Sequence, residues 1–230
     1  MSESARRVGR KIRAPFNKRA VLAELDKFHA KEKGLDDIVD AAIKFPSKGL
    51  FKVESIQQRS EIMALATAVA EIKPKNILEI GTARGGTLLI WSQLASHKVV
   101  SCDLEDPDIR LPVYEAFPPP SSQCKVTHLS GDSHSADFKA RVEAQFDGEL
   151  VDFLFIDGDH TEKGVEQDYN DYKHLVRPGG LIAFHDIIEK QALPTNQVYY
   201  FWERLKPTVT VEEFINDPNQ TGFGIGLVRV

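Results

Sequence analysis

The sequence is poor in cysteine and has no long hydrophobic run. Its 230 residues include only two cysteines, Cys102 and Cys124, too few for a disulfide framework. No apolar stretch approaches the ~20 residues that a membrane-spanning helix needs, and there is no apolar core of a signal peptide. These absences argue against a disulfide-rich secreted protein and against a membrane protein. We therefore expect a cytoplasmic protein in a reducing environment.

The sequence also lacks an excess of positive charge. Lys+Arg 29 against Asp+Glu 34 gives −5, and residues 1–20 alone contribute +6, so the remainder stands at −5 − 6 = −11. An acidic body disfavours nucleic acid as a partner, because binding it requires basic residues that neutralise phosphates. For the basic segment 1–20 we expect a mobile terminus. The alternatives are contact with an anionic surface, steering of an anionic substrate, and an organelle-targeting peptide.

Hydrophobic periodicity predicts an N-terminal extension followed by one α/β domain. Apolar residues at helical spacing predict one or two helices over 17–44 and another over 54–72. Short β-branched runs then predict seven strands, over 76–80, 98–104, 124–130, 151–157, 180–186, 208–215 and 222–230. We expect an extension over 1–56 and an α/β domain over 57–230. The domain would be a three-layer, Rossmann-like fold whose mostly parallel sheet ends in an antiparallel strand pair.

Polar residues or glycines follow each of the first five predicted strands. Ligands of open α/β sheets bind beyond the carboxyl ends of the strands, so these positions mark the expected site. In chain order they read "EIGTARGGT", Asp103, "GDS", "DGDH" and "HD". A fold held only by packing has no need for this regularity.

The first of these stretches is a glycine-rich turn between a strand and a helix. It reads G-x-x-x-G-G, and so lacks the second glycine of the G-x-G-x-x-G dinucleotide fingerprint. Glu79, just before the glycines, would suit a cationic or zwitterionic ligand better than a pyrophosphate. Asp103 lies 24 residues after Glu79, where an acid that binds ribose is expected. A tight turn without a ligand is the alternative, and the spacing disfavours an NAD-dependent oxidoreductase.

The motifs "ILEIGTARGGT", "SCDLED", "SGDS", "FIDGDH" and "VRPGGLIAFHD" together resemble a class I S-adenosylmethionine-dependent methyltransferase over roughly 58–230. Within that class the chain is similar to the catechol O-methyltransferase-like group, and to cephalosporin hydroxylase-like proteins and antibiotic sugar O-methyltransferases. The resemblance implies that one set of residues holds the methionine part of the cofactor: Glu79, Gly81, Thr82, Gly85 and Gly86. It further implies that Asp103, with Leu104 beside it, binds the ribose, and that Asp132 and Ser133 border the adenine.

The stretch "FIDGDHTEKG", 155–164, combines acidic residues with a histidine. Asp159 and Glu162 have the spacing of a capping pair for a helix that begins near Thr161. Asp157 ends a predicted strand, and His185 and Asp186 end the next one, 28 and 29 residues later. These three residues are candidate ligands for Mg²⁺, Mn²⁺ or another divalent metal, and a hydrogen-bond network without a metal is the alternative. The catechol-type enzymes have Asp-Asn where this chain has His-Asp.

His160 and Asp157 are the candidate catalytic residues, and His160 is the candidate base. In the catechol-type enzymes its position carries a lysine that removes the substrate proton, and a histidine with an ordinary pKa of ~6.5 can replace it. His185 is the alternative base, and a structural role is the alternative for His160. The sequence thus predicts O-methylation of a small molecule. A cephalosporin hydroxylase-like enzyme and a non-catalytic cofactor-binding partner protein are the alternatives. The helices before the sheet, with Gln57 and Gln58, are candidates for a substrate lid or for a contact in a homo-oligomer.

Overall fold

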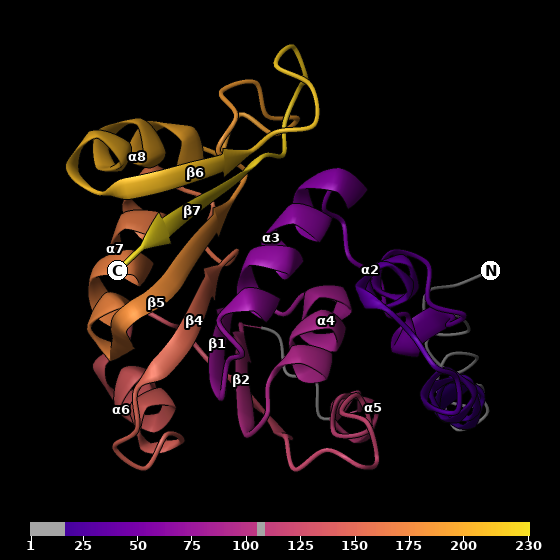
Figure 1. Cartoon of the computed structure of the whole chain (residues 1–230). Helices are drawn as coiled ribbons and strands as arrows, with labels where there is room; N and C mark the ends of the chain where they lie inside the picture. Colours follow the sequence, from indigo (N-terminus) through magenta and orange to yellow (C-terminus); the bar gives the residue numbers. More distant parts are fainter. Residues whose placement is uncertain (1–16, 105–108) are drawn as a thin grey trace, which may run out of the picture.

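A computed structural model describes residues 17–104 and 109–230, and the chain over these residues forms one seven-stranded sheet between layers of helices (Figure 1). The strands are β1 (Asn76–Ile80), β2 (Lys98–Asp103), β3 (Lys125–Ser130), β4 (Val151–Ile156), β5 (Val176–His185), β6 (Thr210–Phe214) and β7 (Ile225–Arg229). Their order across the sheet is β3-β2-β1-β4-β5-β7-β6, and β7 is antiparallel to both of its neighbours. The predicted fold class is confirmed, as is the C-terminal antiparallel pair.

Two strands begin more than two residues away from the predicted position. β7 begins at Ile225 rather than at residue 222, because Gly222, Phe223 and Gly224 all have positive φ angles, which a strand does not permit. β5 begins at Val176 rather than at residue 180, because Val176 pairs with Val151 across a shift in register. The Pro-Gly-Gly stretch, 178–180, lies within this strand although it has the composition of a breaker.

Helices cover both faces of the sheet. On one face lie α3 (Arg59–Glu71), α4 (Gly86–Leu94) and α5 (Leu111–Tyr114), and on the other α6 (Ala136–Ala144), α7 (Glu162–Tyr172) and α8 (Val198–Leu205). Successive residues of a strand point to opposite faces. Phe153 and Phe155 of β4 therefore pack in the core beneath α3 and α4, whereas Leu154 and Ile156 pack beneath α7 and α8. No helix over the described ranges is long and apolar enough to span a bilayer.

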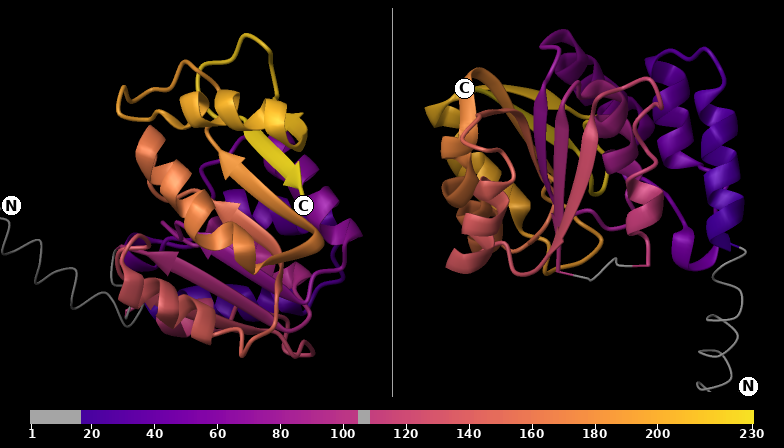
Figure 2. Two further views of the ribbon diagram at one scale, coloured as in Figure 1. Left: turned by 90° about the vertical axis from the view of Figure 1, so that its left-hand side faces the viewer. Right: turned by 90° about the horizontal axis from the view of Figure 1, so that it is seen from below.

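The extension adds an outer layer on one side. Helical residues 17–29 and α2 (Leu35–Ile43) lie outside α3 and α4, in indigo in Figure 2, and the 3₁₀ turn η1 (Gly49–Phe51) follows. The predicted helix over 54–72 begins only at Arg59, and residues 52–58 run to it without helical structure. Residues 1–16 of the basic segment lie outside the described residues. The two further 3₁₀ turns are η2 (Lys173–Leu175) and η3 (Lys206–Thr208).

The start of α7 corrects one prediction. Thr161 caps this helix, and its hydroxyl accepts a hydrogen bond from the N–H of Gly164 at 3.0 Å. The predicted capping pair of Asp159 with Glu162 is therefore wrong. Asp159 lies two residues too early, and its Oδ1 accepts the N–H of Thr161 at 2.8 Å. A short polar side chain directly before the first helical residue reaches the free N–H groups best, and Thr161 holds that position.

Candidate active site

Two adjoining cavities lie at the carboxyl ends of the parallel strands. The larger, of about 570 Å³, is lined by the ends of β1 and β2, the residues that follow β3, and the loop after β4. The smaller, of about 330 Å³, is bounded by residues 54–57, by the residues that follow β1 and β5, and by parts of 191–196 and 221–223. Gly81, Ala83, Asp157 and His160 line both cavities, and so mark the junction between them. This is the edge of the sheet at which a ligand is expected.

Two of the glycines after β1 allow close backbone crossings. Gly81 has φ +99°, and a Cβ on it would lie 2.0 Å from the carbonyl oxygen of Asp157. A Cβ on Gly86 would lie 2.0 Å from the backbone nitrogen of Ser55, which precedes α3. A side chain at either position would push the two backbones apart. Gly85 lines neither cavity. These glycines therefore have a packing role independent of any ligand.

Asp103 ends β2 and fixes the loop after β1. Its Oδ2 accepts the N–H groups of Thr82 at 3.1 Å and of Ala83 at 2.7 Å. Leu104, Asp132 and Ser133 line the larger cavity with Asp103, and Leu104 is 76% exposed. With Gly81, the structure thus places five of the predicted cofactor residues around one cavity.

Glu79 lies in the interior of the protein and lines neither cavity. Its Oε1 accepts a hydrogen bond from Trp91 Nε1 at 2.9 Å, and its Oε2 accepts one from Ser101 Oγ at 2.5 Å. The Ser101 hydroxyl is also bonded to that of Thr82, in the loop after β1. Burial raises the pKa of Glu79 to about 7 in spite of these bonds. Glu79 therefore reaches the site through other side chains, among them Ser101 and Thr82.

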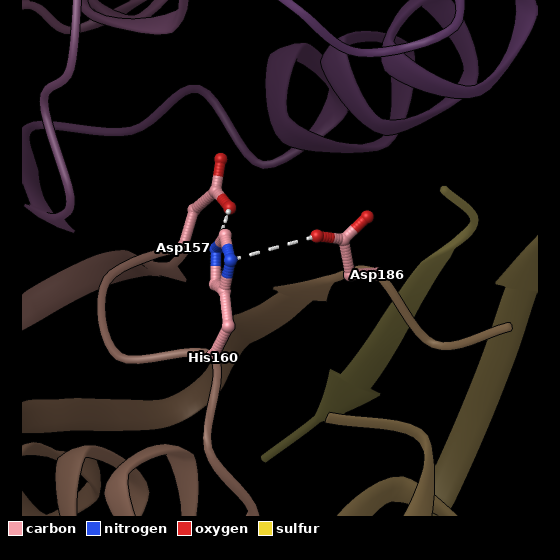
Figure 3. Close-up of side chains that lie close together, drawn as sticks. All are labelled: Asp157, His160 and Asp186. Carbon is pink, nitrogen blue, oxygen red and sulfur yellow. Dashed lines mark hydrogen bonds and ion pairs between the residues drawn. The ribbon is translucent and has the colours of Figure 1, made fainter. Parts of the chain in front are cut away.

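Asp157, His160 and Asp186 converge beside the junction of the cavities (Figure 3). His160 Nε2 lies 3.2 Å from Asp157 Oδ1, and His160 Nδ1 lies 3.9 Å from Asp186 Oδ2. One ligand atom from each residue lies within 4.8 Å of the other two. Asp186 has φ +67°, a strained conformation for a residue other than glycine, and such strain is commonly found at functional sites.

His185 lies beside the same two carboxylates but deeper in the protein. Its Nδ1 is 3.2 Å from Asp157 Oδ1 and 3.4 Å from Asp186 Oδ1, and its buried Nε2 has no hydrogen-bond partner. The sequence predicted Asp157, His185 and Asp186 as metal ligands, whereas the group that converges within 4.8 Å contains His160 instead of His185. Both imidazoles therefore face the same oxygen of Asp157, but different oxygens of Asp186.

Charge within this cluster favours the ionised forms. Burial opposes ionisation of Asp157, but the charge of His185 and the hydrogen bonds from both histidines hold the pKa of Asp157 well below its usual range. Burial likewise lowers the pKa of His185, but the charge and hydrogen bond of Asp157 outweigh it and raise that pKa to about 9. The hydrogen bond to Asp157 raises the pKa of His160 as well. With these groups ionised, the Asp157 carboxylate accepts hydrogen bonds from the imidazole rings of both His160 and His185.

Two amide side chains complete the cluster. Gln57 Nε2 donates to Asp157 Oδ2 at 2.7 Å, and Asn196 Nδ2 donates to Asp186 Oδ2 at 2.5 Å. Gln57 also accepts a hydrogen bond from the hydroxyl of Ser55. The sequence singled out Gln57 only as part of a lid or oligomer contact, and no local pattern identifies a partner that lies 100 residues away. The sequence marked Asn196 only as a polar residue and indicated no partner for it.

Comparison with known proteins agrees with this geometry. Residues 78–187 match the model of a family described as a methyltransferase domain. The structure of an O-methyltransferase from Bacillus cereus in complex with SAH (S-adenosylhomocysteine) superimposes with a TM-score of 0.57, at 20% identity, and covers 92% of this chain and 91% of that one. The O-methyltransferase TomG from Streptomyces achromogenes, in complex with SAM, gives a TM-score of 0.57 at 17% identity over 87% of this chain and 91% of that one.

A third structure was determined with a metal. The MycE methyltransferase from the mycinamycin biosynthetic pathway, in complex with Mg, SAH and mycinamycin VI, gives a TM-score of 0.57 at 15% identity and covers 86% of this chain and 54% of that one. No curated protein sequence matches this chain significantly. Over residues 78–187 the chain is thus similar to a methyltransferase domain, and its fold is similar to that of S-adenosylmethionine-dependent O-methyltransferases.

Proposed function

We propose that the protein transfers the methyl group of S-adenosylmethionine to a hydroxyl group of a small molecule. The observation that carries this proposal is the position of Asp157 and His160 at the junction of two cavities. A cofactor in one cavity and an acceptor in the other would meet beside these residues. Because the sulfonium is already a good leaving group, the enzyme mainly has to position the nucleophile and exclude water.

The cofactor is assigned to the larger cavity. Gly81 is assigned to the methionine part of the cofactor, together with Thr82 of the adjoining smaller cavity, and Asp103 and Leu104 are assigned to the ribose. The adenine is assigned to Asp132 and Ser133, which line the same cavity. Glu79 and Gly85 line neither cavity and act indirectly through the loop after β1, whereas Gly86 lines the smaller cavity.

The acceptor is assigned to the smaller cavity. Its carboxylates include Glu54, Asp157 and Asp186, and Glu54 forms ion pairs with both Lys52 and Arg84. These ion pairs occupy the nearby cationic groups. A neutral, hydroxylated small molecule suits such a lining better than a phosphorylated one or a nucleic acid.

His160 is the group to which we assign the acceptor's proton. When Nε2–H donates to Asp157, the neutral ring carries its lone pair on Nδ1. Asp157 thereby fixes the orientation of the ring, and Gln57 and His185 in turn fix Asp157. This is the arrangement of a base that a second group orients.

A divalent metal fits the same donors, since two carboxylates and an imidazole are ligands that such ions accept. Asp157, His160 and Asp186 would hold it, and when bound it would lower the pKa of a coordinated hydroxyl. A nitrogen lone pair that binds a metal cannot also take a proton. The metal role and the base role of His160 therefore exclude each other.

Calorimetric titration tests the cofactor. Wild-type protein is titrated separately with S-adenosylmethionine and with NAD⁺, and we expect heat of binding from the first alone. Asp103→Ala should weaken S-adenosylmethionine binding, because it removes the acceptor that holds the loop after β1. Binding of NAD⁺ alone would contradict the proposed function.

Titration with Mn²⁺, followed by electron paramagnetic resonance, separates the two roles of His160. If the cluster is a metal site, Mn²⁺ binds to wild-type protein and its affinity falls at least tenfold in Asp157→Asn and Asp186→Asn. Glu71→Gln, which changes an exposed carboxylate at the end of α3 away from the cluster, is the control. Equal Mn²⁺ affinity in all four proteins would rule out the metal site and leave His160 as the base.

A further inference from the structure

Two side chains of α7 form hydrogen bonds with Ser133, which lines the larger cavity. Its hydroxyl donates to Asp168 Oδ1 at 2.7 Å, and its backbone carbonyl accepts the hydroxyl of Tyr172 at 2.7 Å. Asp168 and Tyr172 are four residues apart, and therefore lie on the same face of the helix. Both are fully buried. Ser133 is thus fixed both at its side chain and at its backbone.

The hydrogen bond to Asp168 decides which way the Ser133 hydroxyl points. A serine hydroxyl has one proton to donate and two lone pairs that accept. Asp168 takes the proton, because an ionised carboxylate only accepts hydrogen bonds. His134 Nε2 lies 3.1 Å from the same Oδ1, so a second donor faces that oxygen. What Ser133 presents to the cavity is therefore a lone pair.

We propose that Asp168 is a positioning residue that makes Ser133 an obligate hydrogen-bond acceptor, and that this selects a nucleoside with an exocyclic amino group. The assignment rests on the proposed function, which places the adenine beside Asp132 and Ser133. The exocyclic amino group of adenine is a donor, whereas an oxygen at the same place is an acceptor. Two acceptors facing each other in a partly buried site leave both without a partner, which costs about a tenfold loss of affinity or more.

Burial opposes ionisation of Asp168, and it raises the pKa of this residue to about 6 in spite of the hydrogen bond from Ser133. The test is therefore made at pH 7.5, above this pKa, where the carboxylate is ionised. Neither Asp168 nor Tyr172 lines the cavity. Tyr172 acts on it through Ser133, and Asp168 acts through Ser133 and His134.

The test compares S-adenosylhomocysteine with S-inosylhomocysteine, its deaminated analogue, by calorimetry at pH 7.5. We expect wild-type protein to bind the adenine compound at least about tenfold more tightly. Ser133→Ala and Asp168→Ala should bring the ratio of the two affinities close to one. Asp171→Ala is the matched control, since Asp171 lies on the same helix but pairs with Lys139 at 2.9 Å, and it should keep the wild-type ratio.

A purely structural role for Asp168 would weaken both compounds equally and leave their ratio unchanged. That result, in a protein that binds S-adenosylhomocysteine, overturns the assignment of Asp168 without touching the proposed function. Failure of wild-type protein to bind either compound overturns the proposed function itself. If Asp168→Ala does not fold, Asp168→Leu fills more of the same space without a polar atom and is measured in its place.

Discussion

At the residue scale, the side chain with the most partners in the site is Asp157. Its Oδ2 accepts a hydrogen bond from Gln57, and its Oδ1 lies 3.2 Å from ring nitrogens of both His160 and His185. Its position is therefore set by residues from three separate parts of the chain. Gln57 is the partner that precedes the sheet in the sequence, just before α3, and it is 8% exposed.

Gln57→Leu should lower the free energy of unfolding by about 2 kcal/mol, because it leaves an oxygen of Asp157 without its hydrogen bond in a mostly buried site. Gln58→Leu is the matched control. Gln58 precedes α3 without a capping hydrogen bond from its side chain, so the change should be within ~0.5 kcal/mol. Urea unfolding of the three proteins measures both values. Equal losses in the two variants would show that Gln57 does not support the cluster.

Residue types and spacing were enough to predict most of this site, but not its connections. Asp157, His160, His185 and Asp186 were all expected, because each lies at or just after the end of a predicted strand. The choice between His160 and His185 beside the carboxylates depends on ring orientation, which no spacing encodes. Glu79 was expected to face a ligand. Its carboxylate instead bonds Trp91, twelve residues away on the helix that covers that face of the sheet.

At the scale of elements, α3 holds the loop between β6 and β7. Glu61 of α3 is 1% exposed, and its carboxylate accepts three hydrogen bonds from this loop. The donors are the N–H of Asn216 at 3.1 Å, Gln220 Nε2 at 2.7 Å and the N–H of Gly224 at 2.9 Å. Residues 221–223 of the same loop form a wall of the smaller cavity. Glu61 therefore shapes the acceptor cavity without lining it.

Glu61→Ala should release this loop, since two backbone N–H groups and one amide lose their acceptor. We expect a loss of about 2–4 kcal/mol in the free energy of unfolding and faster proteolytic cleavage within 216–224. Glu71→Ala, at the exposed end of the same helix, serves as the control. Limited proteolysis with mass spectrometry locates the cleavage sites. A cleavage pattern identical to that of the wild type would contradict this role of Glu61.

Element type could be predicted from the sequence more reliably than element boundaries. Alternating apolar runs gave all seven strands, because buried parallel strands are rich in β-branched residues. The start of β7 was missed because Phe223 has φ +63°, a conformation set by its surroundings rather than by its own preference. The cap of α7 was misassigned between two polar residues, Asp159 and Thr161, that lie two positions apart. Short-range patterns do not resolve such neighbours.

At the scale of the whole molecule, one buried carboxylate should leave a mark on the pH dependence of stability. The pKa of Glu79 is raised from 4.5 to about 7, chiefly by burial. Between these values the folded state binds more protons than the unfolded state. The stability that Glu79 contributes is thus fully present below pH 4.5, and is lost as pH rises through 7.

This loss amounts to about 3 kcal/mol between pH 4.5 and pH 8. Glu79→Gln should reduce the fall in the free energy of unfolding over this pH range by that amount, because glutamine does not titrate. Asp168, whose pKa is also raised, keeps a smaller slope of the same sign in the variant. Urea unfolding at pH 5, 6, 7 and 8 measures both curves, with Glu71→Gln as an exposed control. Parallel curves for wild type and Glu79→Gln would contradict the prediction.

The contact between Gln57 and Asp157 also has a consequence for how the protein is made. It joins residues 100 positions apart, and the bonds of Glu61 reach residues 155 to 163 positions further along the chain. At ~5–20 residues per second of synthesis, Gln57 waits on the order of 5–20 seconds for its partner to be made. Gln57 and α3 therefore emerge long before the residues that complete their contacts. During that interval the buried side of α3 has no complete sheet to cover, and the site forms only after residues 216–224 have been made.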